Sequence, residues 1–293
     1  MPRFAGVYVA VITPFTHDDR VDEARLRTHV RWLLDRGVHG IVSAGSCGEY
    51  AALADAERTL VVETVADVCR DRVPVVVGTG ASSTRNAVRW AEHARRCGAA
   101  GIMALPPSAY RPSRSEIRAW YEALAAVGLP IVAYNNPFDT TVDLTPELLA
   151  ELAPIENLVA VKEYSGDVRR IPEILDRTRL EVIVGCDDLA LEGMLAGATG
   201  WIAGLSNVLA SESVELYDLV RAGEIERAAN LYRRLLPLFR YDSKPTFVQA
   251  IKYAFDLIGN PAGAPRPPRL PLEDADRRTI AAALEAFLSI AQR

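Results

Sequence analysis

A lysine at the end of a long apolar run is the side chain in this sequence best placed for covalent chemistry. Only three of the 33 basic residues are lysines, namely Lys162, Lys244 and Lys252. Lysine and arginine exchange readily on a solvated surface, but only lysine offers a primary amine that can condense with a carbonyl carbon. Lys162 follows the apolar residues 158–161, whereas the other two lie in an amphipathic segment and are expected to face solvent or another subunit. Lys162 is therefore the candidate nucleophile, and pairing with Glu163 at a strand rim is the structural alternative.

Two further segments carry candidate groups. Gly45-Ser46-Cys47-Gly48-Glu49 places a hydroxyl and a thiol between two glycines. Its backbone N–H groups suit a carboxylate, and a tight turn without a ligand is the alternative. Tyr134-Asn135-Asn136-Pro137 contains a tyrosine whose ordinary pKa is about 10, so proton transfer at neutral pH would require a relay or a cationic neighbour. Packing at the rim of the fold would explain Tyr134 equally well.

The composition is that of a globular protein, either one α/β barrel or two smaller domains. The 293 residues are 49% hydrophobic and carry a formal net charge of −5, with a pI near 5.5. This balance argues against a nucleic-acid partner. No apolar run is long enough for a membrane span and no export signal is evident, so a cytoplasmic protein is expected. The four scattered cysteines are expected to be reduced, and no metal is expected because the four histidines show no metal-ligand spacing.

Short apolar runs alternate with helical patterns up to about residue 222, which predicts the elements that must position these groups. Eight strands are predicted, at 6–13, 40–44, 73–79, 100–105, 130–134, 158–162, 181–185 and 200–205. The helices between them are predicted at 22–36, 55–70, 82–97, 113–127, 145–153, 168–177, 188–196 and 206–221. Runs that are apolar on both faces indicate a covered parallel sheet, and no G-x-G-x-x-G loop supports a doubly wound rival. The α/β fold is thus predicted to be a (β/α)8 TIM barrel over residues 1–222, with a C-terminal helical extension over 223–293.

In such a barrel, catalytic groups come from the carboxyl ends of the strands. All three segments fall there, and together they resemble the dihydrodipicolinate synthase and N-acetylneuraminate lyase family over essentially the whole chain. The resemblance implies a homotetramer, a dimer of dimers, that acts on a small-molecule 2-oxo acid or imino acid without metal or organic cofactor. It implies that Lys162 forms the Schiff base and Tyr134 shuttles protons. It further implies that Ser46, with the N–H groups of Ser46 and Cys47, holds the substrate carboxylate. Gly48, Asn136, Tyr110, Asp139 and the carbonyl of Ile202 are implied to line the substrate site.

The sequence departs from the family pattern in the pocket expected to bind the second substrate. Where synthases of the family carry an arginine after the Tyr134 corner, this chain has Phe138-Asp139-Thr140, and an aspartate would repel a carboxylate. The slot of a second relay tyrosine is expected to hold Ala109, beside Tyr110. The Tyr134 corner and the segments 162–167 and 248–252 are more similar to 1-pyrroline-4-hydroxy-2-carboxylate deaminases, which we take as the leading expectation.

Several alternatives remain open at this point. Within the family they are a 2-keto-3-deoxy sugar acid aldolase or dehydratase, and 4-hydroxy-tetrahydrodipicolinate synthase. A barrel that senses a ligand without turnover is the non-enzymatic alternative. A metal-dependent aldolase on the same fold is disfavoured by the lack of clustered histidines and carboxylates.

Overall fold

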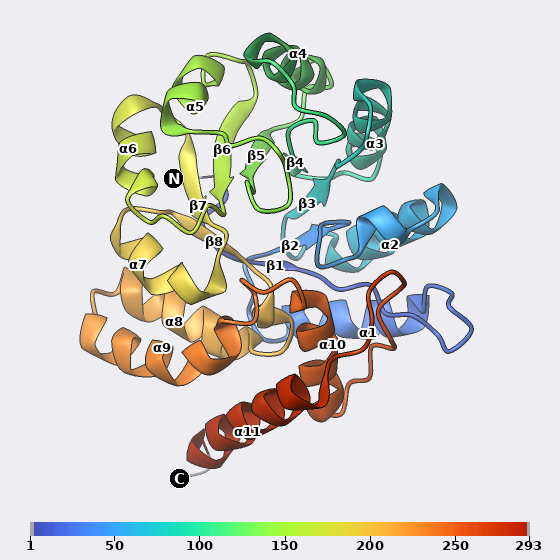
Figure 1. Cartoon of the computed structure of the whole chain (residues 1–293), viewed down its shortest axis with the longest axis vertical. Coiled ribbons are helices and arrows are strands. Elements are labelled where there is room, and N and C mark those ends of the chain that lie inside the picture. The colour runs from blue at the N-terminus through green and yellow to red at the C-terminus, as the bar shows by residue number, and fades with distance from the viewer. Residues whose placement is uncertain (1–2, 292–293) are drawn as a thin grey trace.

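The chain forms a closed barrel of eight parallel strands wrapped by helices (Figure 1). The computed structural model describes residues 3–291. Neighbouring strands pair in chain order, and the ring closes where Tyr8 of the first strand lies opposite Ile202 of the last. The strands are β1 (Gly6–Ala10), β2 (Gly40–Ser43), β3 (Val75–Gly78), β4 (Gly101–Ala104), β5 (Ile131–Asn135), β6 (Leu158–Glu163), β7 (Glu181–Val184) and β8 (Gly200–Ala203). The predicted (β/α)8 barrel is confirmed.

The helices that cover the barrel follow the predicted pattern, one after each strand. They are α1 (Glu23–Leu34), α2 (Asp55–Cys69), α3 (Thr84–Arg96), α4 (Arg114–Ala125), α5 (Pro146–Leu152), α6 (Arg170–Arg177), α7 (Ala190–Leu195) and α8 (Ala210–Arg221). Ser113 begins α4 with a capping box, because its hydroxyl accepts the Glu116 N–H while the Glu116 carboxylate accepts the Ser113 N–H. Almost every strand residue is buried, as expected for a sheet with side chains packed on both faces.

Asn207 explains two places where the predicted boundaries are wrong. Strand β1 ends at Ala10 rather than residue 13, and beyond it the Ile12 N–H donates to Asn207 Oδ1 at 3.1 Å. The predicted helix 206–221 is split into a 3-10 turn, η3 (Leu205–Asn207), and α8. The Asn207 amide donates to the carbonyls of Ala10 and Gly204, both at 2.8 Å, and thereby ties the end of β8 to β1.

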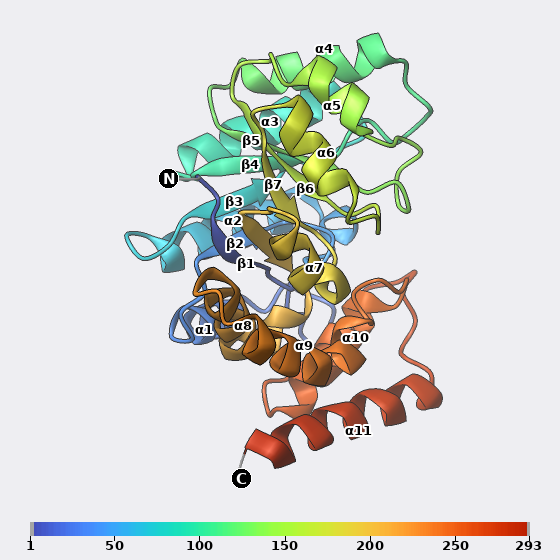
Figure 2. The same ribbon diagram turned by 90° about the vertical axis from the view of Figure 1, so that its left-hand side faces the viewer.

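Three helices follow the barrel at the carboxyl end of the chain: α9 (Ile225–Phe239), α10 (Phe247–Leu257) and α11 (Asp274–Ala291). Helix α9 packs on α8, and α11 packs across α9 and α10 on the side away from the barrel (Figure 2). Helix α10 contacts η3, so the extension reaches the end of the barrel where the strands terminate. The division into units 1–222 and 223–293 stays a prediction. Among residues 3–291, no helix has the length and apolar character that crossing a membrane requires.

Candidate active site

Strands β5 and β6 bring Tyr134 and Lys162 together at the carboxyl end of the barrel. The two residues are directly opposite in the β5–β6 register, and both side chains are buried. Lys162 Nζ lies 4.2 Å from the centre of the Tyr134 ring and 5.5 Å from that of Tyr164. Because side chains alternate along a strand, Glu163 points away from Lys162 and instead accepts hydrogen bonds from Asn135 Nδ2 and the Ser165 N–H. Within the described residues Lys162 has no ion-pair partner within 4.0 Å, so its predicted alternative pairing with Glu163 is wrong.

A small cavity surrounds the Lys162 amine and collects six of the residues expected at the site. Its wall is formed by Ala10, Ser46, Cys47, Met103, Tyr134, Asn136, Asp139, Lys162, Tyr164, Gly204, Asp242 and Phe247. It opens into an outer cavity of about 970 Å³, which shares Ser46, Asp139, Tyr164 and Phe247 with it. A small molecule therefore has a route from solvent to the amine.

Three expected site residues lie outside this wall. The Gly48 carbonyl accepts a hydrogen bond from the Thr13 hydroxyl at 2.7 Å. Ile202 is buried in the barrel, and Gly204, two residues later, lines the cavity instead. Tyr110 is 53% exposed on the loop before α4, where its hydroxyl donates to Glu116 Oε1 at 3.0 Å. Within one chain, Tyr110 is therefore not placed as a relay for Tyr134.

The loop after β2 presents free backbone donors to the cavity. Ala44 and Glu49 both adopt left-handed backbone angles, with φ of 53° and 54°, and these fold the loop back over the strand end. The N–H of Glu49 donates to the Ser46 carbonyl at 3.1 Å. The N–H groups of Ser46 and Cys47 donate to no protein acceptor in the described part of the chain. This is the arrangement that an anion-binding loop requires.

Asn136 connects the Tyr134 hydroxyl to Asp139. Its side-chain amide donates to Tyr134 Oη at 3.2 Å and to Asp139 Oδ2 at 2.8 Å, and its Oδ1 accepts the Asp139 N–H at 3.1 Å. Burial raises the pKa of Tyr134 well above its usual value, the Asp242 charge adds to the effect, and the hydrogen bond from Asn136 partly opposes it. The phenol is therefore protonated at neutral pH and available as a donor.

Asp242 and Tyr164 line the cavity and were missed in the sequence. Asp242 lies in the segment between α9 and α10, and burial raises its pKa to about 7, against the opposing charge of Lys162. The Tyr164 hydroxyl donates to the Asp242 carbonyl at 2.5 Å. Tyr164 directly follows β6 and stands two residues after Lys162, so continuing the period of two past the strand end could have identified it. Asp242 lies 80 residues after Lys162 in the sequence, and no local sequence pattern identifies it.

Asp187, also buried, fixes the position of Asp242 relative to the barrel. The Asp187 N–H donates to Asp242 Oδ2 at 3.2 Å. The Asp187 carboxylate accepts Trp201 Nε1 at 2.9 Å and the Leu205 N–H at 2.6 Å. Burial and the neighbouring Asp242 charge raise the pKa of Asp187 well above the usual range. Burial and the mutual repulsion of the two acidic groups therefore favour a state in which at least one of them is protonated.

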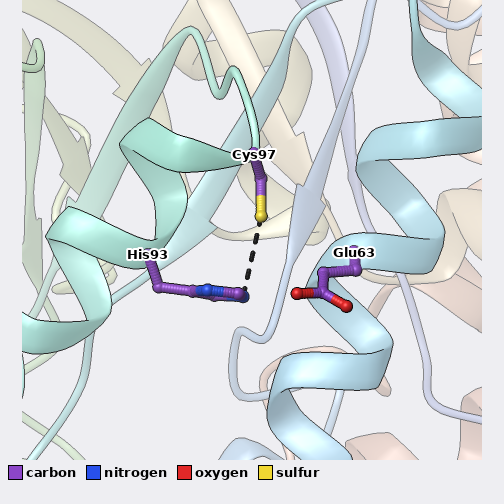
Figure 3. A group of neighbouring side chains, drawn as sticks. All are labelled: Glu63, His93 and Cys97. Atoms are coloured by element: carbon purple, nitrogen blue, oxygen red, sulfur yellow. Dashed lines mark hydrogen bonds between the residues drawn. The ribbon is translucent and has the colours of Figure 1, made fainter.

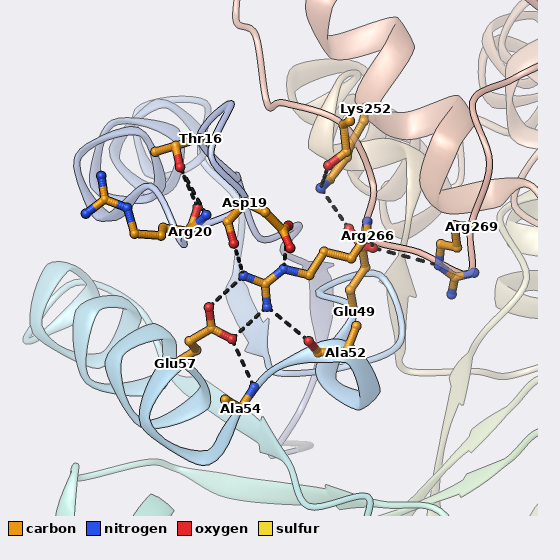
Figure 4. Close-up of polar contacts among 11 residues, drawn as sticks. Thr16, Asp19, Arg20, Glu49, Ala52, Ala54, Glu57, Lys252, Arg266 and Arg269 are labelled. Carbon is orange, nitrogen blue, oxygen red and sulfur yellow. Dashed lines mark hydrogen bonds and ion pairs between the residues drawn. The ribbon is translucent and has the colours of Figure 1, made fainter.

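The C-terminal extension braces the Ser46 loop through Glu49 (Figure 4). Lys252 Nζ lies 2.7 Å from Glu49 Oε1, with both side chains at most 2% exposed, and the Arg266 N–H donates to Glu49 Oε2 at 2.9 Å. The expectation that Lys252 faces solvent or a subunit contact is wrong, because the inner face of α10 covers this loop. Lys244 is 45% exposed and pairs with Asp276, as its amphipathic segment predicts.

Arg266 extends the same brace to the neighbouring segments. Its guanidinium donates to both Glu57 carboxylate oxygens at 2.6 Å, to Asp19 Oδ1 at 2.9 Å and to the Ala52 carbonyl at 3.0 Å (Figure 4). Gly263 allows the approach: its φ is +76°, and a Cβ there would lie 2.1 Å from the Phe15 carbonyl oxygen. The extension thus fixes the geometry of the loop that offers the free N–H groups.

The cavity wall offers no cluster of metal ligands in the residues that the structure describes. Among the described residues, one group of three potential metal ligands exists elsewhere: Glu63, His93 and Cys97 lie together on the outer side of the barrel. His93 was not singled out in the sequence, but the structure places it near Cys97, one helical turn later, and near Glu63 of a neighbouring helix.

The closed parallel barrel defines a TIM-barrel protein, and the buried lysine at a strand end lines its candidate site. The sequence model of the dihydrodipicolinate synthetase family matches residues 3–287. The chain belongs to this family and is a lyase of it. It is 38% identical over 284 residues to 4-hydroxy-tetrahydrodipicolinate synthase of Methanospirillum hungatei, covering 94% of this chain and 96% of the relative. It is 40% identical over 278 residues to the protein of that name from Methanoculleus marisnigri, with 93% and 94% covered.

Solved structures agree with this assignment. The dihydrodipicolinate synthase of Acinetobacter baumannii, solved with pyruvate, superposes with a TM-score of 0.93 and 30% identity, covering 97% of this chain and 99% of that one. These relatives favour the synthase, which was an alternative in the sequence analysis, over the expected pyrroline deaminase.

Proposed function

We propose that the protein is a Schiff-base lyase in which Lys162 attacks the carbonyl carbon of a 2-oxo acid. The observation that carries this proposal is the buried Lys162 amine, which lines the cavity and has no ion-pair partner among the described residues. Its neutral amine adds to the carbonyl, water leaves, and a protonated imine forms. The imine withdraws electrons from the adjacent C–H bond, so that a carbon nucleophile forms there. The wall offers Asp242, as a carboxylate, to stabilise the positive imine.

The other residues of the cavity have complementary roles in this proposal. The N–H groups of Ser46 and Cys47, with the Ser46 hydroxyl, bind the substrate carboxylate, because both residues line the cavity and their N–H groups have no acceptor in the described part of the chain. Tyr134 donates a proton to the departing oxygen and takes it back later, and Asn136 holds its hydroxyl in place. The carbonyl role that the family resemblance implies for Ile202 is better suited to Gly204, which lines the cavity.

We propose 4-hydroxy-tetrahydrodipicolinate synthase activity as the reaction, with pyruvate as the 2-oxo acid and a carboxylate-bearing aldehyde as the acceptor. The names of the relatives support it. The outer cavity also contains a cation that can meet a second carboxylate. Arg269 lines it and is 30% exposed. Among the described residues its guanidinium donates no hydrogen bond to protein; it lies 3.9 Å from Glu49 Oε2 and 5.4 Å from the centre of the Phe247 ring.

The deaminase is a second candidate, and Asp139 favours it. Asp139 lines both cavities, and no cation pairs with its carboxylate among residues 3–291. A carboxylate at this position disfavours an acceptor with a second negative charge, and it suits a cyclic imine or a polyhydroxy chain. A keto-deoxy sugar acid would meet the same environment.

A turnover screen with the full chain separates these reactions. Pyruvate with aspartate semialdehyde, hydroxypyrroline carboxylate and 2-keto-3-deoxy sugar acids are supplied separately, and the cyclic product, released ammonia and released aldehyde are measured independently. The proposal expects the cyclic product from the first pair. If ammonia release from hydroxypyrroline carboxylate were the only turnover, the synthase proposal would be wrong and the protein would be a deaminase. Binding of all these acids without turnover would indicate a ligand sensor.

We also propose that the chain assembles as a homotetramer, as the family resemblance implies. A related structure is described as a monomeric variant of dihydrodipicolinate synthase, so assembly is not a fixed property of the fold. Light scattering should find particles of four 32.0-kDa chains. A monomer at working concentration would contradict this assembly.

A further inference from the structure

Helices α2 and α3 hold three side chains of metal-binding type on the outer side of the barrel. Glu63 comes from α2, His93 from α3 and Cys97 from the residue that caps α3. Figure 3 shows the carboxylate, the imidazole and the thiol converging between the two helices. One potential ligand atom of each lies within 4.8 Å of the others. None of the three lines the cavity around Lys162, so the catalytic proposal does not use them.

The sulfur and nitrogen atoms already have the spacing of a zinc site. Cys97 Sγ lies 3.6 Å from His93 Nε2. In a tetrahedral zinc site, bond lengths of about 2.3 Å to sulfur and 2.0–2.1 Å to nitrogen place these two atoms about 3.6 Å apart. Without a metal the same contact is a weak hydrogen bond between thiol and imidazole. The two residues are one helical turn apart, so the helix itself fixes their separation.

The backbone of α2 lies beside the imidazole. Thr59 of α2 acts to raise the pKa of His93, which is the effect of a carbonyl oxygen near a ring N–H. Metal-binding histidines characteristically donate their second ring nitrogen to such an oxygen, which leaves the other nitrogen free for the metal. Glu63 is exposed and lies one turn beyond Thr59 on α2, so its carboxylate can rotate to complete the set.

An ion can reach these groups from solvent. An open cavity of about 400 Å³ is lined by Glu63 and Cys97, together with three arginines. Arg27 and Arg70 are both paired with the Asp67 carboxylate of the same wall. Burial lowers the pKa of His93, the Glu63 charge opposes this, and the Arg96 charge adds to it. Loss of the thiol proton and the Glu63 carboxylate together supply two negative charges, which balance a divalent ion.

We propose that Glu63, His93 and Cys97 bind a zinc ion that fastens α2 to α3, with water in the fourth position. Binding converts the thiol to a metal thiolate and releases one proton to solvent, with no change of oxidation state. The ion takes no part in the reaction at Lys162, because none of the three ligands lines that cavity. Its loss should lower thermal stability in the presence of zinc and leave turnover unchanged.

Cobalt titration of the full chain tests this site directly. Co²⁺ should produce a thiolate-to-metal charge-transfer band with a stoichiometry of one, and Zn²⁺ should remove it by competition. Cys97→Ser should abolish the band, and Glu63→Gln should weaken binding by at least about 100-fold, because a direct ligand is lost and groups that only support a ligand are already worth about 10–100-fold. Glu92→Gln is the matched control, since it removes an exposed carboxylate of α3 beside His93 that is not in the group.

The outcomes distinguish this site from the catalytic proposal. Folding of each variant is checked by circular dichroism, and Glu63→Gln alters only an exposed side chain. No charge-transfer band at saturating Co²⁺, or an equal band in Cys97→Ser, overturns the zinc site. Turnover of the wild type is measured separately, so failure of the proposed activity leaves the titration interpretable.

Discussion

Replacing Lys252 by methionine should destabilise the protein strongly, although Lys252 lies outside the catalytic cavity. Removing one partner of a buried ion pair costs about 3–5 kcal/mol, because the other charge stays buried. Here the remaining Glu49 carboxylate keeps the Arg266 N–H at 2.9 Å and the Arg269 guanidinium at 3.9 Å. We therefore expect Lys252→Met to lower the free energy of unfolding by about 3 kcal/mol, the lower end of this range. Methionine keeps a long unbranched side chain at this position but removes the ammonium group, which lies 4.2 Å from the centre of the Phe15 ring, so the loss reports the charge.

The assay is thermal unfolding at a fixed scan rate, combined with steady-state kinetics. A loss of about 3 kcal/mol corresponds to roughly 6–12 °C in a chain of this size. Because Glu49 ends the loop that contains Ser46, the KM for the 2-oxo acid should rise more than kcat falls. Lys244→Met is the matched control: its pair with Asp276 is exposed, and its loss should cost less than about 1 kcal/mol.

A double variant tests the reasoning most sharply. Glu49→Gln combined with Lys252→Met removes both charges, and replacing a whole buried pair is often nearly neutral. The double variant should therefore recover most of the stability lost in Lys252→Met. Equal Tm losses in Lys252→Met and Lys244→Met, or no recovery in the double variant, would refute the buried-pair interpretation.

Three further variants concern the charged groups of the two cavities. Burial raises the pKa of Asp242 to about 7, so between pH 4 and 7 the folded state binds more protons than the unfolded state, and the contribution of Asp242 to stability falls as pH rises. Tm measured against pH should therefore decline less in Asp242→Asn than in the wild type, and parallel curves would contradict this assignment. Asp139→Arg should lower the KM for acceptors with a second carboxylate, and Arg269→Leu should raise it by about 10-fold or more, the value of one hydrogen bond to a charged group. Unchanged KM values in both variants would place these residues outside the acceptor site.

The sequence predicts the barrel well because its information is local. Apolar runs and cap residues mark each strand and helix, and the strand end that contains Lys162 follows directly from them. Asn207 shows where this fails: its side chain bonds Ala10, almost 200 residues earlier, and so breaks a helix that its own segment favours. Local periodicity has no access to such a contact.

The site is predicted only as far as the strand ends reach. Tyr134 and Ser46 belong to the loops and strands next to Lys162, so barrel topology brings them together. Asp242 and Lys252 come from the helical extension, whose docking the sequence pattern does not define. Lys252 was therefore expected to lie on the exposed face of an amphipathic helix. In the structure it is buried and pairs with the Glu49 carboxylate.

The most direct test of the central claim is reductive trapping of the Schiff base. The full chain is incubated with pyruvate and borohydride, digested, and analysed by mass spectrometry, with Lys162→Arg as the variant that keeps the charge. We predict one reduced pyruvyl adduct per chain, located on Lys162 and absent from the variant. An adduct on another lysine, or no adduct on a folded protein that turns over pyruvate, would contradict the proposed mechanism.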